Sequence, residues 1–165
     1  MAKIVNVVAS CSNTGKTVLI EGLIKELKSR GNSVATIKHD VHGFDIDKEG
    51  KDTWRHRKSG AEAVIISSKN RMALIRELEE EIPLEKLIEQ VKSFDFIIIE
   101  GYKNSDYRKI EVFRSGVSNE IITPKSKLIA IASDVSLDLE DIEVINLNDY
   151  NMIANVISNE KDFEF

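Results

Sequence analysis

The sequence predicts an α/β fold in which a mostly parallel β-sheet is flanked by helices on both faces. Apolar, β-branched segments alternate with segments whose apolar residues recur at helical spacing, which is the pattern of such a sheet. The first strand-like segment, KIVNVVA at residues 3–9, is apolar almost throughout, as expected of a strand covered on both faces. Because we find no repeat, linker or low-complexity segment, we expect one domain spanning residues 1–165.

The other elements are predicted from periodicity and from turn residues. The predicted helices cover residues 16–31, 53–60, 83–93 and 148–161. Apolar residues recur at helical spacing in 16–31 and 83–93, whereas 53–60 is a short helix closed by Gly60 and 148–161 is the closing helix. The further predicted strands share short apolar runs between polar segments, and they cover residues 33–38, 62–68, 94–102, 109–114, 127–134 and 142–147, with 71–77 as an additional candidate. Residues 39–52 contain two glycines and four aspartates without periodicity, which predicts a long polar loop.

The segment between the first strand and the first helix is similar to a phosphate-binding loop. Residues 10–17, SCSNTGKT, match the pattern G-x-x-x-x-G-K-[ST] except at its first position, and the flanking strand and helix are the context that the pattern requires. Backbone N–H groups would bind phosphate whatever the side chains, Lys16 would reach the β- and γ-phosphates, and the Thr17 hydroxyl would bind Mg²⁺. The predicted phosphate-binding residues are Ser12, Asn13, Thr14, Gly15, Lys16 and Thr17.

Ser10 is the one departure from the pattern, because it occupies the position of the first glycine. A glycine there allows a positive φ, and another residue in that conformation costs on the order of 1 kcal/mol. We therefore expect a modest local strain at Ser10 that leaves the loop able to bind phosphate.

Two charged residues end predicted strands at the carboxyl edge of the sheet, where ligands of open parallel sheets bind. Glu100 ends the strand FDFIIIE and precedes Gly101, which lets the backbone come close at that edge. A carboxylate at this position holds Mg²⁺ directly or through water in nucleotide hydrolases, although a solvent-facing strand end is the alternative. Lys38 ends the strand 33–38 at the same edge, where a cation would face phosphate.

The residues alone do not identify the base of a bound nucleotide. The guanine signature Asn-Lys-x-Asp is absent. Asp134 ends the buried strand of IASD and could accept hydrogen bonds from guanine N1 and from the exocyclic amine, or it could be only a polar strand end.

The polar loop and the helix after it carry weaker candidates. His39 and His42 lie near three aspartates, which either bind a metal or simply solvate the loop. The basic cluster from Lys48 to Lys58 either faces the nucleotide or forms a solvated helix face. No glutamine or arginine is plainly placed to assist hydrolysis, although Arg55 or Arg57 could act as a cis arginine, so we expect slow hydrolysis.

Composition narrows the class of protein. Hydrophobic residues make up 42% and charged residues 31% of the chain, and the net charge of −5 argues against broad nucleic-acid binding. No apolar run near 18 residues and no leader pattern is present, so we expect no membrane span, no signal peptide and a cytoplasmic location. The single cysteine, Cys11, excludes an intrachain disulfide and a cysteine-based zinc site, and is either a small filler or a redox residue.

Four blocks of the sequence form a pattern that spans nearly the whole chain. They are SNTGKT, IKHDVHGFDIDKEGKDTWRHRKSGA, FDFIIIEGYK followed by KIEVFR, and IAIASDVSL. The third block is the most specific, because a strand, Glu-Gly-aromatic-Lys, a short spacer and a second strand form an unusual order among phosphate-loop proteins. Together the blocks resemble the molybdopterin-guanine dinucleotide biosynthesis protein B (MobB) family.

The resemblance implies a P-loop NTPase fold of the class that includes dethiobiotin synthetase and the nickel-insertion GTPases, with GTP and Mg²⁺ as ligands. It also implies a homodimeric adapter with weak GTPase activity that works with MobA, the guanylyltransferase that attaches GMP to molybdopterin; molybdopterin or its guanine dinucleotide would then be a partner. Carried onto this sequence, Lys16 would serve the phosphates and Glu100 the metal, and Lys38 and the 39–52 loop with Asp52 would face the γ-phosphate or the cofactor.

Two other hypotheses remain at this point. The protein could be an ATP-dependent small-molecule kinase or ligase of the dethiobiotin synthetase type, with residues 39–58 forming its acceptor site. It could also be a degenerate fold that binds no nucleotide.

Overall fold

The computed structural model describes residues 2–163. The chain forms two compact units: Met1–His39 with Leu84–Phe165, here called the sheet unit, and Asp40–Pro83, here called the hairpin unit. Among the described residues, no helix is long and apolar enough to cross a membrane.

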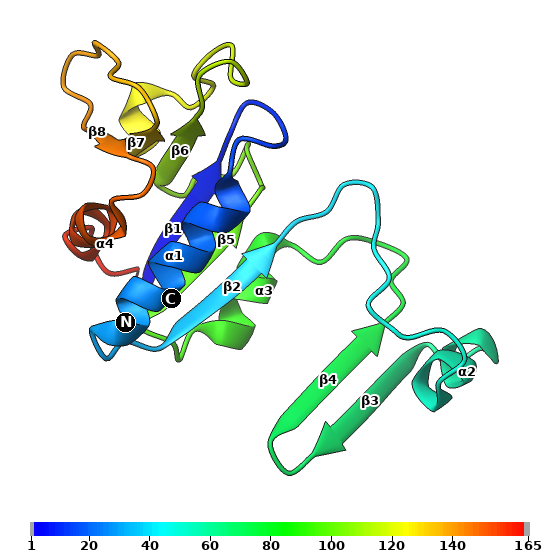
Figure 1. Ribbon diagram of the computed structural model, residues 1–165. Helices are drawn as coiled ribbons and strands as arrows, with labels where there is room; N and C mark the ends of the chain where they lie inside the picture. The colour runs from blue at the N-terminus through cyan, green and yellow to red at the C-terminus, as the bar shows by residue number, and fades with distance from the viewer. Residues whose placement is uncertain (1, 164–165) are drawn as a thin grey trace. The chain divides into compact units, whose positions relative to one another are not determined.

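The sheet unit contains a six-stranded sheet in the order β2-β5-β1-β6-β7-β8 within residues 2–163 (Figure 1). Its strands are β1 (Lys3–Val8), β2 (Val34–Lys38), β5 (Phe96–Glu100), β6 (Lys109–Phe113), β7 (Leu128–Ser133) and β8 (Val144–Asn146). Every neighbouring pair is parallel, so the carboxyl ends of all six strands lie at one edge. This confirms the predicted α/β fold with a mostly parallel sheet, and β1 lies inside it with β5 on one side and β6 on the other.

Helices cover both faces of this sheet. Successive residues of a strand point to opposite faces, so neighbouring residues of one strand pack against different helices. In β5, Ile98 packs in the cluster formed with α1 (Lys16–Ser29) and α4 (Tyr150–Ser158). Its neighbours Ile97 and Ile99 pack in the cluster formed with α3 (Leu84–Val91). All three isoleucines are fully buried, and full burial of such a side chain contributes about 1.5–3 kcal/mol. The predicted helices and strands are thus confirmed, with boundaries shifted by a few residues.

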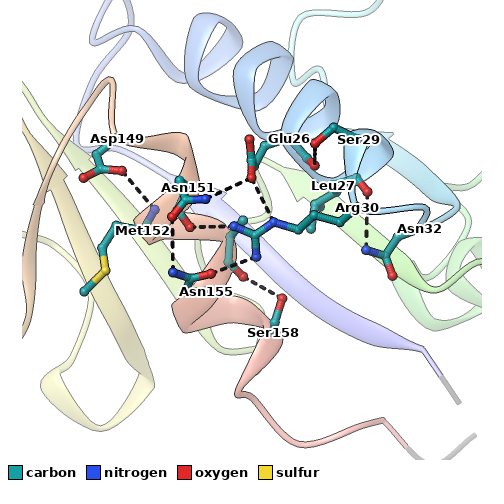
Figure 2. A network of polar contacts seen from close by, with 11 residues as sticks. Glu26, Leu27, Ser29, Arg30, Asn32, Asp149, Asn151, Met152, Asn155 and Ser158 are labelled. Atoms are coloured by element: carbon teal, nitrogen blue, oxygen red, sulfur yellow. Dashed lines mark hydrogen bonds and ion pairs between the residues drawn. The ribbon is translucent and has the colours of Figure 1, made fainter.

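A polar network joins α1 to α4 (Figure 2). The guanidinium of Arg30 donates to Glu26 at 2.9 Å, to Asn155 Oδ1 at 2.8 Å and to the carbonyl of Asn151 at 3.0 Å. Asp149 caps α4 by accepting the backbone N–H three residues further on at 3.0 Å. The network therefore fixes the start of α4, and with it the turn that links β8 to α4, relative to α1.

The hairpin unit has its own small framework. It consists of α2 (Asp52–Lys58), β3 (Ala63–Ser68) and β4 (Arg71–Arg76), and the two strands form an antiparallel pair of their own. Both strand predictions are confirmed, but these strands pair only with each other among the described residues. The Arg57 guanidinium joins the parts of this unit, because it contacts Glu77 at 2.9 Å, Asp45 at 3.2 Å and Asp47 at 3.4 Å.

The two ends of the described chain meet beside β1. Ala2 forms an antiparallel bridge with Phe163, and the Phe163 ring lies 5.6 Å from that of Tyr107. In the sequence, the apolar residues of the C-terminal segment FEF are either a candidate dimer contact or simply a chain end. Two residues of this segment, Glu164 and Phe165, lie outside the described residues.

Gly22 allows α4 to approach α1 closely. A Cβ atom at Gly22 would lie 2.3 Å from the Tyr150 ring, which no structure tolerates without movement. We expect Gly22→Ala to lower the free energy of unfolding by about 1–3 kcal/mol, the usual cost of overpacking. In a Tyr150→Ala background the same change should instead raise it by up to about 1 kcal/mol, because alanine is the better helix former. Urea denaturation of the four proteins checks this, and equal effects of Gly22→Ala in both backgrounds would contradict it.

Candidate nucleotide-binding site

The loop between β1 and α1 emerges at the carboxyl edge of the sheet. Asn13 and Gly15 adopt positive φ angles of 61° and 97°, so their neighbouring N–H groups can turn toward one side, as in anion-binding backbone nests. Ser10 is not among the residues with positive φ in the described chain. The expected strain at Ser10 is therefore wrong: this position does not need glycine here, and the left-handed conformation falls on Asn13, a residue type that tolerates it.

The start of α1 offers uncapped donors. Gly15 is the N-cap residue, and no side chain forms a capping hydrogen bond at this end. The first N–H groups of a helix have no intrahelical partner, and together with the helix dipole they favour an anion. Thr14 is fully buried, and its Oγ1 has no hydrogen-bond partner among the described residues. The predicted residues Ser12 to Thr17 thus form a loop with unsatisfied polar groups at a helix start.

Three lysines surround this loop, and we call Lys16, Lys38 and Lys103 the lysine cluster. Lys16 Nζ donates to the carbonyl of Cys11 at 3.1 Å, and Lys103 Nζ donates to the carbonyl of Ser10 at 2.9 Å. Burial lowers the pKa of Lys16, Glu100 opposes this effect, and the charges of Lys103 and Lys38 lower the pKa further. Like charges gathered in this way repel, so the cluster creates a positive potential that favours a multiply charged anion.

Glu100 lies within this cluster. It ends β5, is partly buried, and is the register partner of Lys38 at the end of β2. Thr17, in the first turn of α1, is exposed. A carboxylate and a hydroxyl fit Mg²⁺, which takes one or two protein oxygens and completes its octahedron with phosphates and water. Residues 2–163 contain no cluster of three or more potential His, Cys, Asp or Glu ligands, so His39 and His42 do not form part of one.

Buried polar contacts fix the β5–β6 loop that carries Lys103. Lys109 is 1% exposed, and its Nζ donates to the carbonyls of Ser105 at 2.6 Å and Tyr107 at 2.8 Å. From β1, Asn6 Nδ2 donates to the carbonyl of Tyr102 at 3.1 Å and to Ser105 Oγ at 2.8 Å. These contacts hold the loop backbone on both sides of Lys103, whose side chain is exposed. Sequence reasoning did not assign Lys103 a role, although its place three residues after Glu100 is a readable signal.

On the other side of β1, a second group lines a pocket of about 460 Å³ at the ends of β6, β7 and β8. The residues that line this β6–β8 pocket include Gly15, Arg114 and Asp134. Asp134 accepts a hydrogen bond from the Ser115 N–H at 2.8 Å, and its other oxygen lies 4.0 Å from Arg114 Nε. The structure thus places Asp134, predicted as a base-binding residue, in a pocket that the phosphate loop also lines.

Several of the predicted candidates, among them Asp52 and Arg57, belong to the hairpin unit. Asp52 is exposed and is the first residue of α2. Hydrogen bonds to Glu77 and Asp45 raise the pKa of Arg57, whose three carboxylate partners compensate its charge within the unit. Arg57 is therefore a structural residue of the hairpin unit, and its pairing does not favour the role of a cis arginine that the sequence offered for it. The arginine that does lie at the phosphate loop is Arg114, which sequence reasoning missed.

The parallel sheet with a phosphate loop between its first strand and first helix defines a P-loop NTPase-like α/β protein. Residues 4–134 match the family model described as "Molybdopterin guanine dinucleotide synthesis protein B", MobB. The chain is 39% identical over 155 residues to the molybdopterin-guanine dinucleotide biosynthesis adapter protein of Escherichia coli, covering 90% of this chain and 88% of the relative. It is 33% identical to the adapter protein of Haemophilus influenzae, covering 90% and 84%. The chain belongs to the MobB family.

Solved structures agree with this fold. The crystal structure of Bacillus subtilis MobB superimposes with a TM-score of 0.74 at 22% identity, covering 96% of this chain and 99% of that one. A crystal structure titled as molybdopterin-guanine biosynthesis protein B gives a TM-score of 0.69 at 23% identity, covering 94% and 97%.

The conformations of Ser10 and Asn13 predict opposite effects of glycine. Asn13→Gly should leave the free energy of unfolding unchanged or raise it by up to about 1 kcal/mol, because it removes a left-handed non-glycine residue. Ser10→Gly should lower it by up to about 1 kcal/mol, because glycine adds only unfolded-state entropy there. Urea denaturation measures both, and stabilisation by Ser10→Gly would contradict the conformation described for that residue.

Proposed function

We propose that this protein binds GTP with Mg²⁺ at the loop between β1 and α1 and acts as the adapter of molybdopterin guanine dinucleotide biosynthesis. The observation that carries the proposal is the convergence of the lysine cluster and Glu100 on an uncapped helix start. Its relatives from Escherichia coli and Haemophilus influenzae are named as adapter proteins of this pathway, which favours the adapter over an ATP-dependent kinase or ligase.

In this proposal, the predicted residues of the sheet unit divide the ligand among them. The N–H groups of residues 12–17 and the Lys16 ammonium would bind the phosphates, Thr17 and Glu100 would hold Mg²⁺, and Lys38 would face the terminal phosphate. Asp134 would accept the N1 and amino hydrogens of guanine with the lone pairs that Ser115 leaves available. Bound Mg²⁺ would neutralise charge on the phosphates.

Hydrolysis at such a site would be slow. The only glutamine of the chain, Gln90, lies in α3, which ends at the edge of the sheet opposite Glu100. Fast GTPases use a glutamine to orient the attacking water, and Gln90 does not lie where it could do this. The bound nucleotide would therefore persist, which suits an adapter that presents a ligand to a MobA-type guanylyltransferase and to molybdopterin. We place this activity in the cytoplasm.

We further propose that the protein is a homodimer that uses the hairpin unit. Ile65 and Leu74 face each other across β3 and β4 with 65% and 52% exposure, and Met72 beside them is 66% exposed. On the opposite face, Val64 is buried and Ile66 is 54% exposed, so the first face carries the larger number of exposed apolar side chains. A two-stranded sheet is marginally stable alone, so an apolar row of this kind favours a second copy that presents the same row.

Nucleotide titration tests the central proposal. Lys16→Ala should weaken GTP binding by about 100-fold or more, because it removes a charge-assisted contact to the phosphates. Lys28→Ala, at the other end of α1, is the matched control and should bind like the unchanged protein. Calorimetry with GTP and ATP, each with and without Mg²⁺, measures this. Equal binding by the Lys16 variant would show that the loop is not the site.

The same proteins test the adapter role. GTP-loaded protein should increase the yield of guanine dinucleotide in an assay containing a MobA-type guanylyltransferase and molybdopterin, and the Lys16 variant should not. Preference for ATP with rapid turnover on an added acceptor would instead support the kinase or ligase alternative.

The dimer makes a separate prediction. Met72→Glu should shift the protein toward the monomer, because it places a charge in the apolar row, while costing little in a monomer where this side chain is exposed. Met152→Glu, in α4 of the sheet unit, is the control and should leave the oligomeric state unchanged. Sedimentation equilibrium measures the masses, and an unchanged dimer in the Met72 variant would contradict the proposed interface.

A further inference from the structure

We propose that Arg114 is a nucleotide-binding residue that contacts the α-phosphate end of the ligand, where the phosphate loop meets the β6–β8 pocket. This inference rests on the proposed function, because it requires a nucleotide at the β1–α1 loop.

Strand order gives the site two chemically different sides. Lys38 ends β2, Glu100 ends β5 and Lys103 follows β5, and both strands lie on one side of β1. Arg114 and Asp134 follow β6 and β7, which lie on the other. Lys16 takes part in the first side, because the charges that act on it include Glu100, Lys103 and Lys38. The terminal phosphate and metal therefore belong to the β2–β5 side, and the nucleoside must extend toward the β6–β8 pocket.

The chain holds the backbone of Arg114 firmly beside the loop. Its carbonyl accepts the N–H groups of Val117 at 3.1 Å and Ser118 at 2.8 Å, and its own N–H donates to Ser118 Oγ at 3.0 Å. The Cys11 thiol donates to the carbonyl of Val117 at 3.4 Å, which links this turn to the phosphate loop. Because hydrogen bonds hold the turn at Ser118 and at Val117, the backbone position from which the Arg114 side chain extends is well defined.

The Arg114 guanidinium lies directly against the loop. A Cβ atom at Gly15 would be 3.2 Å from Arg114 Nη1, so glycine leaves the space that this group approaches. The Arg114 side chain is 47% exposed, and its contact with Asp134 at 4.0 Å is long for an ion pair. The fork of five N–H donors thus keeps donors for a phosphate, and guanidinium–phosphate contacts are among the strong charge-assisted hydrogen bonds.

Arg108 provides a matched control. It precedes β6 as Arg114 follows it, its side chain is 46% exposed, and it pairs with a carboxylate, Glu160, at 3.2 Å. The two arginines therefore resemble each other in exposure and lie at opposite ends of the same strand. They differ in pairing, because Arg108 donates to both carboxylate oxygens of Glu160 and to the carbonyl of Ser126.

The experiment is a titration of Arg114→Gln and Arg108→Gln with the fluorescent mant derivatives of GTP and GDP in the presence of Mg²⁺. We expect Arg114→Gln to weaken both ligands by about tenfold or more and to the same extent, because both carry the α-phosphate. Arg108→Gln should bind like the unchanged protein. Thermal unfolding of both variants confirms that they fold.

The outcomes separate this inference from the proposed function. If the unchanged protein binds GTP and Arg114→Gln binds equally well, Arg114 is not a binding residue and the proposed function stands. If the loss is confined to GTP, Arg114 serves the γ-phosphate and the orientation derived above is wrong. If the unchanged protein binds neither nucleotide at millimolar concentration, the proposed function and this inference fall together.

Discussion

The constraint on which the site depends is the position of β1 between β5 and β6 in a parallel sheet. Parallel pairing brings the carboxyl ends of neighbouring strands to one edge, so the loop after β1 must emerge between the residues that follow β5 and β6. Burial of Val5 and Val7 against α1 and α4 keeps this strand in the centre. Glu100 and Arg114 lie beside the loop because of this pairing, and Lys38 and Asp134 lie one strand further out on each side.

The lysine cluster at this edge of the sheet is electrostatically unfavourable, and this indicates what the cluster is for. Gathering Lys16, Lys38 and Lys103 around one carboxylate, Glu100, leaves an excess of positive charge in a chain whose net charge is −5. Burial of Lys16 adds to the cost, since it lowers the pKa of its ammonium group. Folding alone gives no reason for such a cluster; in the proposed function, the charge of a triphosphate with Mg²⁺ compensates it.

Periodicity made most elements predictable, because strands such as β5 are covered on both faces and helices such as α1 show one apolar stripe. The loop motif was also recognisable in the sequence, but the conformation of its residues was not. A glycine position in a pattern does not fix φ, and in this loop the left-handed residues are Asn13 and Gly15, not Ser10. Arg114 escaped detection because its nearness to Gly15 depends on β6 pairing with β1, and a single sequence does not contain strand order.

The strand order also determines from which side of the site the chain continues into the hairpin unit. His39 ends the first segment of the sheet unit, so the chain enters the hairpin unit one residue beyond Lys38, on the side assigned to the terminal phosphate. At that exit, His39 stacks on Tyr102 at 4.3 Å, and Tyr102 holds a φ of 46° two residues after Glu100. The nucleoside side has no such connection, since β8 continues into α4. In a GTP-binding adapter, therefore, the group that distinguishes GTP from GDP would lie next to the residues at which the chain leaves for the hairpin unit.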